Sequence, residues 1–232
     1  DGSVWQHTQG FSNILDKTPV TSGTQFRLGS ISKMFVSWSI MKLVEQGKLN
    51  LNDRLAQLAP EIEFINPWEQ QYPVRDVHLL EHTTGWDAPH FAESSYNEPE
   101  PLSTLDGLTL HPHSRQSRWI PGSRSAYNNT GPTVAAYIVE KLSGITFEAF
   151  VHQNFFAPLG MTKTNYFLTQ HYKNNAAALY KGQRPLPYEN LVNRAAGALN
   201  SDLEDMLKLI QFLRNSGAHN SQPTLSAESL AI

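Results

Sequence analysis

Ser30 and Lys33 have the residue types and the spacing that nucleophilic catalysis needs. Residues three apart on a helix share a face, so the lysine ammonium can reach the serine hydroxyl across one turn. Serine is a poor nucleophile unless a base or a positive field activates it, and the N-terminus of a helix adds free N–H groups and a positive dipole end. The pair therefore predicts a serine nucleophile assisted by lysine. The same local pattern also fits an ordinary helix-capping serine beside a solvated lysine.

The Ser-x-x-Lys spacing recurs ten residues later, at Ser39 and Lys42. Ser39 lies in the middle of the predicted helix, where a serine hydroxyl usually bonds back to a carbonyl one turn earlier. No free N–H groups are available there. Position on the helix therefore favours Ser30 over Ser39 as the nucleophile.

Tyr127 and Asn129 form a second candidate pattern, Tyr-x-Asn, in the turn before a predicted helix. A tyrosine whose proton is drawn off by a neighbouring lysine can act as general base to a serine. An asparagine can both steady that lysine and bind a substrate amide. Two further copies of the pattern stand in polar segments and are interpreted as surface residues: Tyr172 with Asn174, and Tyr188 with Asn190.

Helices and strands alternate irregularly along the chain. Apolar periodicity and turn residues predict a strand over 3–10 and loops over 87–119, and they predict strands within 166–192. Helices are expected over 30–46, 51–60, 74–82 (capped by Asp76), from Pro132 to Gly144, over 146–160 and over 201–217, with the start of another at 225–232.

Composition excludes several function classes. The 232 residues are 40% hydrophobic and 17% charged, which is typical of a soluble globular protein. A net charge of −3 does not support a nucleic-acid partner. The absence of cysteine excludes disulfides, thiolate zinc sites and cysteine nucleophiles. No apolar run approaches the roughly 20 residues of a membrane-spanning helix, and no signal peptide is visible after Asp1.

Histidines invite a metal hypothesis, because His82, His90, His111 and His113 lie near one another in sequence. Zinc sites need three or four ligands at fixed spacing, and no His-Glu-x-x-His or comparable set is present. We therefore expect no metal and no cofactor. For His82 a role in loop structure is favoured. The Gly-x-Ser-x-Gly elbow of α/β-hydrolases is absent.

Five segments in order, "FRLGSISKMF", "LLEHTTGW", "PGSRSAYNNTG", "APLGMTKT" and "AAGALNSDLEDML", carry a family resemblance. Over roughly residues 10–217 the chain resembles the class C β-lactamase and penicillin-binding-protein group of serine hydrolases, which includes D-alanyl-D-alanine peptidases and esterases. The resemblance implies an α+β fold of the β-lactamase/transpeptidase type, with a helical cluster packed on a mainly antiparallel sheet.

Residue roles follow from the same resemblance. Ser30 would be the acylated nucleophile, Lys33 would activate it, and its backbone N–H would form half of the oxyanion hole. Tyr127 would be the general base that then protonates the leaving group, and Asn129 would contact substrate and Lys33. The implied reaction is acyl transfer from an amide, β-lactam or ester carbonyl through an acyl-enzyme to water.

One element of the family pattern is missing, the Lys-Thr-Gly or His-x-Gly triplet that lines the cleft from a strand. Residues 1–232 are therefore expected to be a single domain of this type, incomplete at both termini. The alternative is a non-catalytic penicillin-binding-like protein that keeps the fold without turnover. A small molecule or peptidoglycan is the implied substrate, and a periplasmic or extracellular location is suggested by the resemblance alone.

Overall fold

The computed structural model describes residues 4–87, 95–96, 100–110, 112–216, 218–219 and 222–231. Its helices are the 3₁₀ turn η1 (Gly29–Ile31), α1 (Ser32–Glu45), α2 (Leu55–Leu58), α3 (Asp76–Leu80), α4 (Thr104–Thr109), the 3₁₀ turn η3 (Pro112–Ser114), α5 (Thr130–Ser143), α6 (Phe147–Val151), the π-helical turn η4 (His152–Phe156), α7 (Ala157–Leu159), α8 (Gln170–Asn175), α9 (Arg194–Gly197), α10 (Leu203–Arg214) and α11 (Ala227–Ala231).

Strands in the described part of the chain are short and pair two at a time, always antiparallel. They are β1 (Phe11–Asn13) with β2 (Thr18–Pro19), β3 (Phe26–Arg27) with β8 (Asn200–Ser201), β4 (Ser95–Tyr96) with β7 (Asn190–Leu191), β5 (Leu179–Lys181) with β6 (Arg184–Leu186), and β9 (Ala218–His219) with β10 (Gln222–Pro223). The expected antiparallel pairing is therefore present, as separate pairs instead of one sheet.

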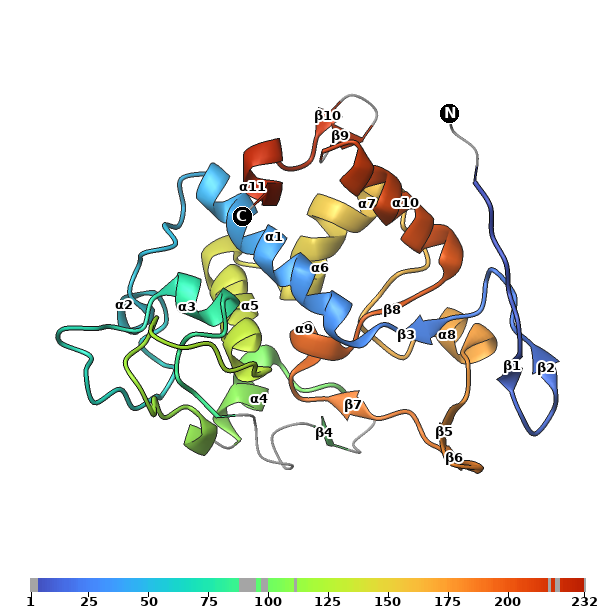
Figure 1. The fold of residues 1–232 in the computed structure, drawn as a ribbon, viewed down its shortest axis with the longest axis horizontal. Helices are drawn as coiled ribbons and strands as arrows, with labels where there is room; N and C mark the ends of the chain where they lie inside the picture. The colour runs from blue at the N-terminus through green and yellow to red at the C-terminus, as the bar shows by residue number, and fades with distance from the viewer. Residues whose placement is uncertain are drawn as a thin grey trace.

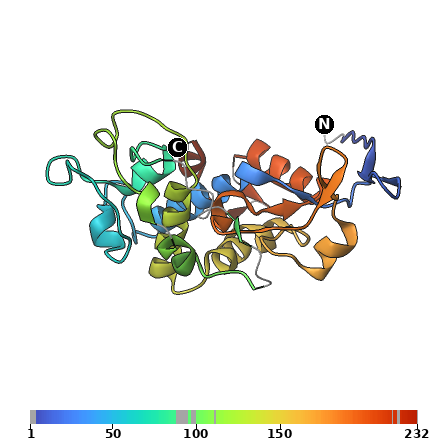
Figure 2. The same cartoon turned by 90° about the horizontal axis from the view of Figure 1, so that it is seen from below.

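α1 runs through the middle of the molecule with α5, α6 and α9 packed around it (Figure 1). Figure 2 shows the same helices as a thick cluster, with the β1–β2 hairpin at the far end of the molecule. Phe35 and Trp38 of α1 pack edge-on against each other, and both contact the ring of Phe155. All three side chains are buried. Full burial of a large apolar side chain contributes about 1.5–3 kcal/mol to the stability of the fold. The first turns of α1 are therefore held in place by the hydrophobic core.

The predicted helices are present, but their boundaries differ in several places. The helix expected over 51–60 is reduced to α2, and the one expected over 146–160 is divided into α6, η4 and α7. The first helical residues of 30–46 form the turn η1 before α1 begins. Arg75, not Asp76, precedes α3, and Asp76 is its first helical residue. α5 begins at Thr130, so Pro132 is the third residue and not the first. Gly144 and Gly160 end their helices in the left-handed conformation, as predicted.

Two predictions of local structure were wrong, the strand over 3–10 and the uninterrupted loops over 87–119. Residues 4–9 form no strand, because no neighbouring segment in the described part of the chain pairs with them. Within 87–119 the structure contains α4, whose start the sequence does encode: the Ser103 hydroxyl accepts a hydrogen bond from the Asp106 backbone N–H at 3.1 Å. That is the local signature of a helix N-cap. Residues 88–94, 97–99 and 111 of this stretch lie outside the described residues.

Candidate active site

Ser30 lies in η1, at the entrance to α1. The turn is possible because Gly29 adopts a φ of +56°, a left-handed conformation that glycine reaches without steric cost. Ser32 stabilises the turn with two hydrogen bonds. Its hydroxyl donates to the Gly29 carbonyl at 2.6 Å and accepts from the Leu199 N–H at 3.1 Å. The β3–β8 pairing fixes the preceding residues. Ser30 is therefore exposed on a turn that one distant segment, residues 199–201, anchors at two points.

Three predicted residues meet at the Ser30 hydroxyl. Lys33 Nζ donates a hydrogen bond to Ser30 Oγ at 3.1 Å and a second one to the Ala196 carbonyl at 2.8 Å. Tyr127 Oη lies 2.6 Å from Ser30 Oγ, although the two residues are 97 positions apart in sequence. The Ser30 side chain caps no helix, so the alternative of a plain N-cap serine does not hold. This arrangement places a hydroxyl nucleophile between a cation and a titratable phenol.

Electrostatics at this cluster act on Tyr127. Burial by itself would raise the pKa of the phenol, but interaction with Lys33 and the hydrogen bond with Ser30 outweigh it, and the pKa is lowered from its usual value of 10. The Lys33 ammonium also lies 4.8 Å from the centre of the Tyr127 ring. A phenol with a lowered pKa gives up its proton more readily, as a general base that cycles through its phenolate must.

Asn129 forms no hydrogen bond with the other three predicted site residues in the described part of the chain. Within the described residues its side chain forms no hydrogen bond with Lys33, whose partners are Ser30 and Ala196. The neighbouring Asn128 is buried instead, and its side-chain oxygen accepts from the Gly131 N–H at 2.7 Å. The expected contact between Asn129 and Lys33 is therefore not made here. A substrate contact by Asn129 stays a prediction.

Comparison with known proteins decides the family. A family model described as Beta-lactamase matches residues 1–231. The chain belongs to the beta-lactamase family.

Individual members of this beta-lactamase family are distant in sequence. A beta-lactamase of Yersinia enterocolitica is 26% identical over 212 residues, which make up 91% of this chain and 52% of that protein. Penicillin-binding protein 4* of Bacillus subtilis is 27% identical over 178 residues, or 71% of this chain and 35% of that protein. The chain thus spans about half the length of these relatives, or less.

A solved structure confirms the fold expected of a beta-lactamase family member. The octameric penicillin-binding protein homologue from Pyrococcus abyssi superposes with a TM-score of 0.78 at 27% identity, over 96% of this chain and 51% of that chain. The α+β class of the β-lactamase type is therefore confirmed, as is the family resemblance read from the sequence.

The second copies of both sequence patterns lie elsewhere in this beta-lactamase fold. Ser39 is buried in α1 and donates to the Phe35 carbonyl at 2.6 Å, as expected for a mid-helix serine, and Lys42 Nζ bonds to the Thr224 carbonyl at 2.7 Å. Tyr172 was expected at the surface, which was wrong. It is buried and packs edge-on against the ring of Tyr188, with ring centres 5.4 Å apart.

His82 is the residue near this site whose contact the sequence did not reveal. Its ring lies against the Tyr127 ring, with centroids 4.5 Å apart. Burial first, and then the charge of Lys33, lowers the pKa of the His82 imidazole. The signal available in the sequence was its place in the segment "HTTG", which we interpreted as loop structure alone.

The histidines of the metal hypothesis fall partly within the described residues. His90 and His111 lie outside the described residues, and no cluster of three or more potential ligand side chains occurs in the part that is described. Over the same described residues, no helix combines the length and apolar character needed to cross a bilayer.

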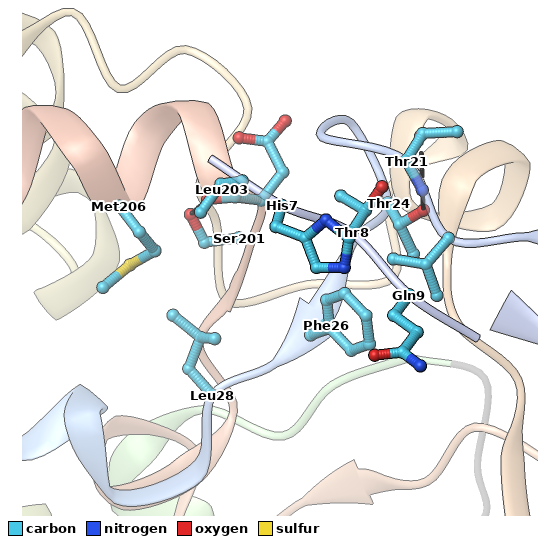
Figure 3. A pocket seen from close by; sticks show the side chains of 12 residues that line it. His7, Thr8, Gln9, Thr21, Thr24, Phe26, Leu28, Ser201, Leu203 and Met206 are labelled. Carbon is cyan, nitrogen blue, oxygen red and sulfur yellow. Dashed lines mark hydrogen bonds between the residues drawn. The ribbon is translucent and has the colours of Figure 1, made fainter. Parts of the chain in front are cut away.

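A hollow of about 370 Å³ lies apart from Ser30, between the segment His7–Gln9, β3 and the start of α10 (Figure 3). Its lining mixes apolar side chains, such as Phe26, with polar ones, such as His7. It contains none of the four predicted site residues. The Ser201 hydroxyl in its lining is hydrogen-bonded with the Thr164 hydroxyl at 2.7 Å.

Proposed function

We propose that residues 1–232 form one β-lactamase-like domain that carries the catalytic serine of a hydrolase acting through an acyl-enzyme on an amide, β-lactam or ester carbonyl. The observation that supports it is the convergence of Lys33 Nζ and Tyr127 Oη on the exposed hydroxyl of Ser30, at 3.1 and 2.6 Å. A nucleophile and its base within hydrogen-bond reach, with a further group holding the base, is the arrangement that covalent catalysis requires.

In the first half-reaction, Ser30 Oγ attacks the substrate carbonyl carbon while its proton passes to Tyr127 Oη. Lys33 stabilises the phenolate form of Tyr127 beforehand and the charge that develops at Ser30 Oγ. The tetrahedral intermediate collapses as the leaving nitrogen or oxygen takes the proton from Tyr127. This leaves Ser30 acylated. Water, deprotonated by the same phenolate, then attacks the ester and restores the free hydroxyl of Ser30.

Two further roles belong to this proposal. The backbone N–H of Ser30 donates to the developing oxyanion, a contribution that costs about 10²- to 10³-fold in rate when one donor is lost from such a site. Asn129, which immediately precedes α5, binds an amide of the substrate. The substrate is a small molecule or a peptidoglycan-type peptide.

Exposure to a penicillin, followed by intact-protein mass spectrometry, tests this function. We expect a mass increase equal to the whole penicillin, because opening a lactam expels no atom, and none for Ser30→Ala. Ser39→Ala is the matched control and should acylate normally. Decay of the adduct over time would indicate lactam hydrolysis, and persistence would indicate a penicillin-binding protein of the peptidase type.

Two results would count against the proposed function. An adduct that survives in Ser30→Ala would remove Ser30 as the nucleophile. If neither a penicillin nor a fluorophosphonate, which is a general serine-hydrolase reagent, modified the chain, the non-catalytic binding protein would be the better account.

A further inference from the structure

The side chain of Tyr127 needs contacts from other residues to hold its hydroxyl at Ser30. It lies in an irregular segment before α5, and 57% of the residue's surface is exposed. Such a phenol has little packing to hold it in one rotamer. Its hydrogen bond to Ser30, however, requires a defined position, because a displacement of about 1 Å in a catalytic group can cost about 100-fold in rate.

His82 contacts the chain on both sides of Tyr127 and the ring of Tyr127 itself. The His82 carbonyl accepts from the N–H of Ala126 at 2.8 Å. His82 Nδ1 accepts from the N–H of Asn128 at 3.4 Å. Between these two bonds, the imidazole packs on the Tyr127 ring with centroids 4.5 Å apart and planes inclined by 43°. One residue thus fixes the residue before the phenol, the residue after it and one face of the phenol.

We propose that His82 is the positioning residue of Tyr127: its carbonyl, its Nδ1 and its ring face together hold the phenol oxygen at Ser30. This inference rests on the proposed function, in which Tyr127 is the general base. His82 itself does not touch the Ser30 hydroxyl, so it acts on the reaction only through Tyr127.

The backbone of His82 supports this assignment. His82 has a φ of +59°, a left-handed conformation that few residues other than glycine adopt. Such strained residues persist where the surroundings hold them, often at functional sites. Here the conformation brings the carbonyl and the ring of one residue to the same segment. The adjoining residues continue the contact, because the Thr83 carbonyl accepts from the Gly122 N–H at 2.9 Å and the Glu81 carbonyl from the Ser125 hydroxyl at 3.3 Å.

The role also requires an imidazole whose Nδ1 carries no proton, since that atom accepts a hydrogen bond. The lowered pKa of His82, which comes from burial and then from Lys33, keeps the ring neutral around pH 7. A protonated ring would lose the bond from Asn128 and would place a second cation beside Lys33.

Two variants separate the positioning role from a merely structural one. His82→Gly adopts a positive φ without strain and removes both the ring and the Nδ1 acceptor. His82→Asn tolerates the same backbone and restores an acceptor oxygen near the position of Nδ1, without the ring. Lys17→Gly is the control for added backbone freedom, because Lys17 also has a positive φ, of 55°, and lies in the turn between β1 and β2, at the far end of the molecule.

Two readouts are measured on all four proteins: the rate of fluorophosphonate labelling, and the pKa of Tyr127 from the ultraviolet difference between each protein and its Tyr127→Phe counterpart. We expect His82→Gly to label about 10- to 100-fold more slowly than wild type, with the Tyr127 pKa moved up toward 10. His82→Asn should fall between the two, and Lys17→Gly should match wild type in both readouts. Thermal melting checks that all variants are folded.

The outcomes distinguish this inference from the proposed function. Wild-type labelling and a wild-type Tyr127 pKa in folded His82→Gly would overturn the positioning role and leave the proposed function intact. If the wild-type chain is not labelled at all, the proposed function fails. The Tyr127 pKa then decides alone: an upward move in His82→Gly supports positioning, and an unchanged value overturns it.

Discussion

Tyr127→Phe is expected to lower the rate of Ser30 acylation by about 10²- to 10⁴-fold, the range that general acid–base catalysis contributes. The substitution removes only the hydroxyl that lies 2.6 Å from Ser30 Oγ. It leaves the phenyl ring in place against His82. Because Tyr127 is 57% exposed and its partner Ser30 is also exposed, removal of the hydroxyl leaves no buried polar group unpaired, and the melting temperature should be unchanged. Fluorophosphonate labelling followed by mass spectrometry gives the rate constants.

Tyr72→Phe is the matched control, because Tyr72 is similarly exposed at 47% and contacts no site residue. It should label at the wild-type rate.

The pH profile gives a second check on Tyr127. Because the proposed mechanism uses the phenolate form of Tyr127, the wild-type rate should rise with pH and level off below pH 10, since the Tyr127 pKa is lowered from 10. A wild-type rate in folded Tyr127→Phe would mean that another group takes the serine proton.

Asp76→Asn is expected to change the free energy of unfolding differently at two pH values. Its effect should be more stabilising at pH 8 than at pH 4, by up to about 4 kcal/mol. Asp76 is fully buried, and within the described residues neither carboxylate oxygen has a hydrogen-bond partner. Burial first, and then the charge of Asp53, raises its pKa from 3.8 to about 7. The folded state therefore holds the proton more tightly than the unfolded state. The stabilisation by Asp76 is complete below pH 3.8 and is lost as the pH rises to about 7.

Urea unfolding of wild type and Asp76→Asn between pH 4 and pH 8 measures this difference. The wild-type free energy of unfolding should fall across the range by a component that Asp76→Asn lacks. Asp16→Asn changes an exposed carboxyl in the β1–β2 turn and should leave the wild-type pH dependence intact. Parallel pH profiles for wild type and Asp76→Asn would show that Asp76 is already ionised in the folded state.

The site was predictable from sequence where its chemistry is local. Ser30 and Lys33 are one helical turn apart, so their contact follows from helix geometry alone. Tyr127 lies 97 residues further along the chain, and its local pattern, Tyr-x-Asn before a helix, marks it as a candidate without placing it near Ser30. Only the resemblance, with its five segments in order, brought it to Ser30. His82 was missed because ring packing and a left-handed backbone depend on tertiary contacts that its segment does not encode.

The fold shows the same division. Gly144 and Gly160 ended helices where predicted, because a left-handed cap is a property of a few adjacent residues. The strand expected over 3–10 depended on a partner, and the described residues supply none. Asp76 has the residue type of an N-cap, yet tertiary packing of α3 made it a buried first helical residue. Predictions therefore failed where a distant segment decides the local structure.

Identification of the residue that becomes covalently modified tests the central claim most directly. The chain is treated with a fluorophosphonate, digested, and sequenced by tandem mass spectrometry. We expect the label on Ser30, with the labelling slowed in Tyr127→Phe and abolished in Ser30→Ala. A label on Ser39 or any other residue, or equal labelling of Ser30→Ala, would contradict the assignment of Ser30 as the nucleophile.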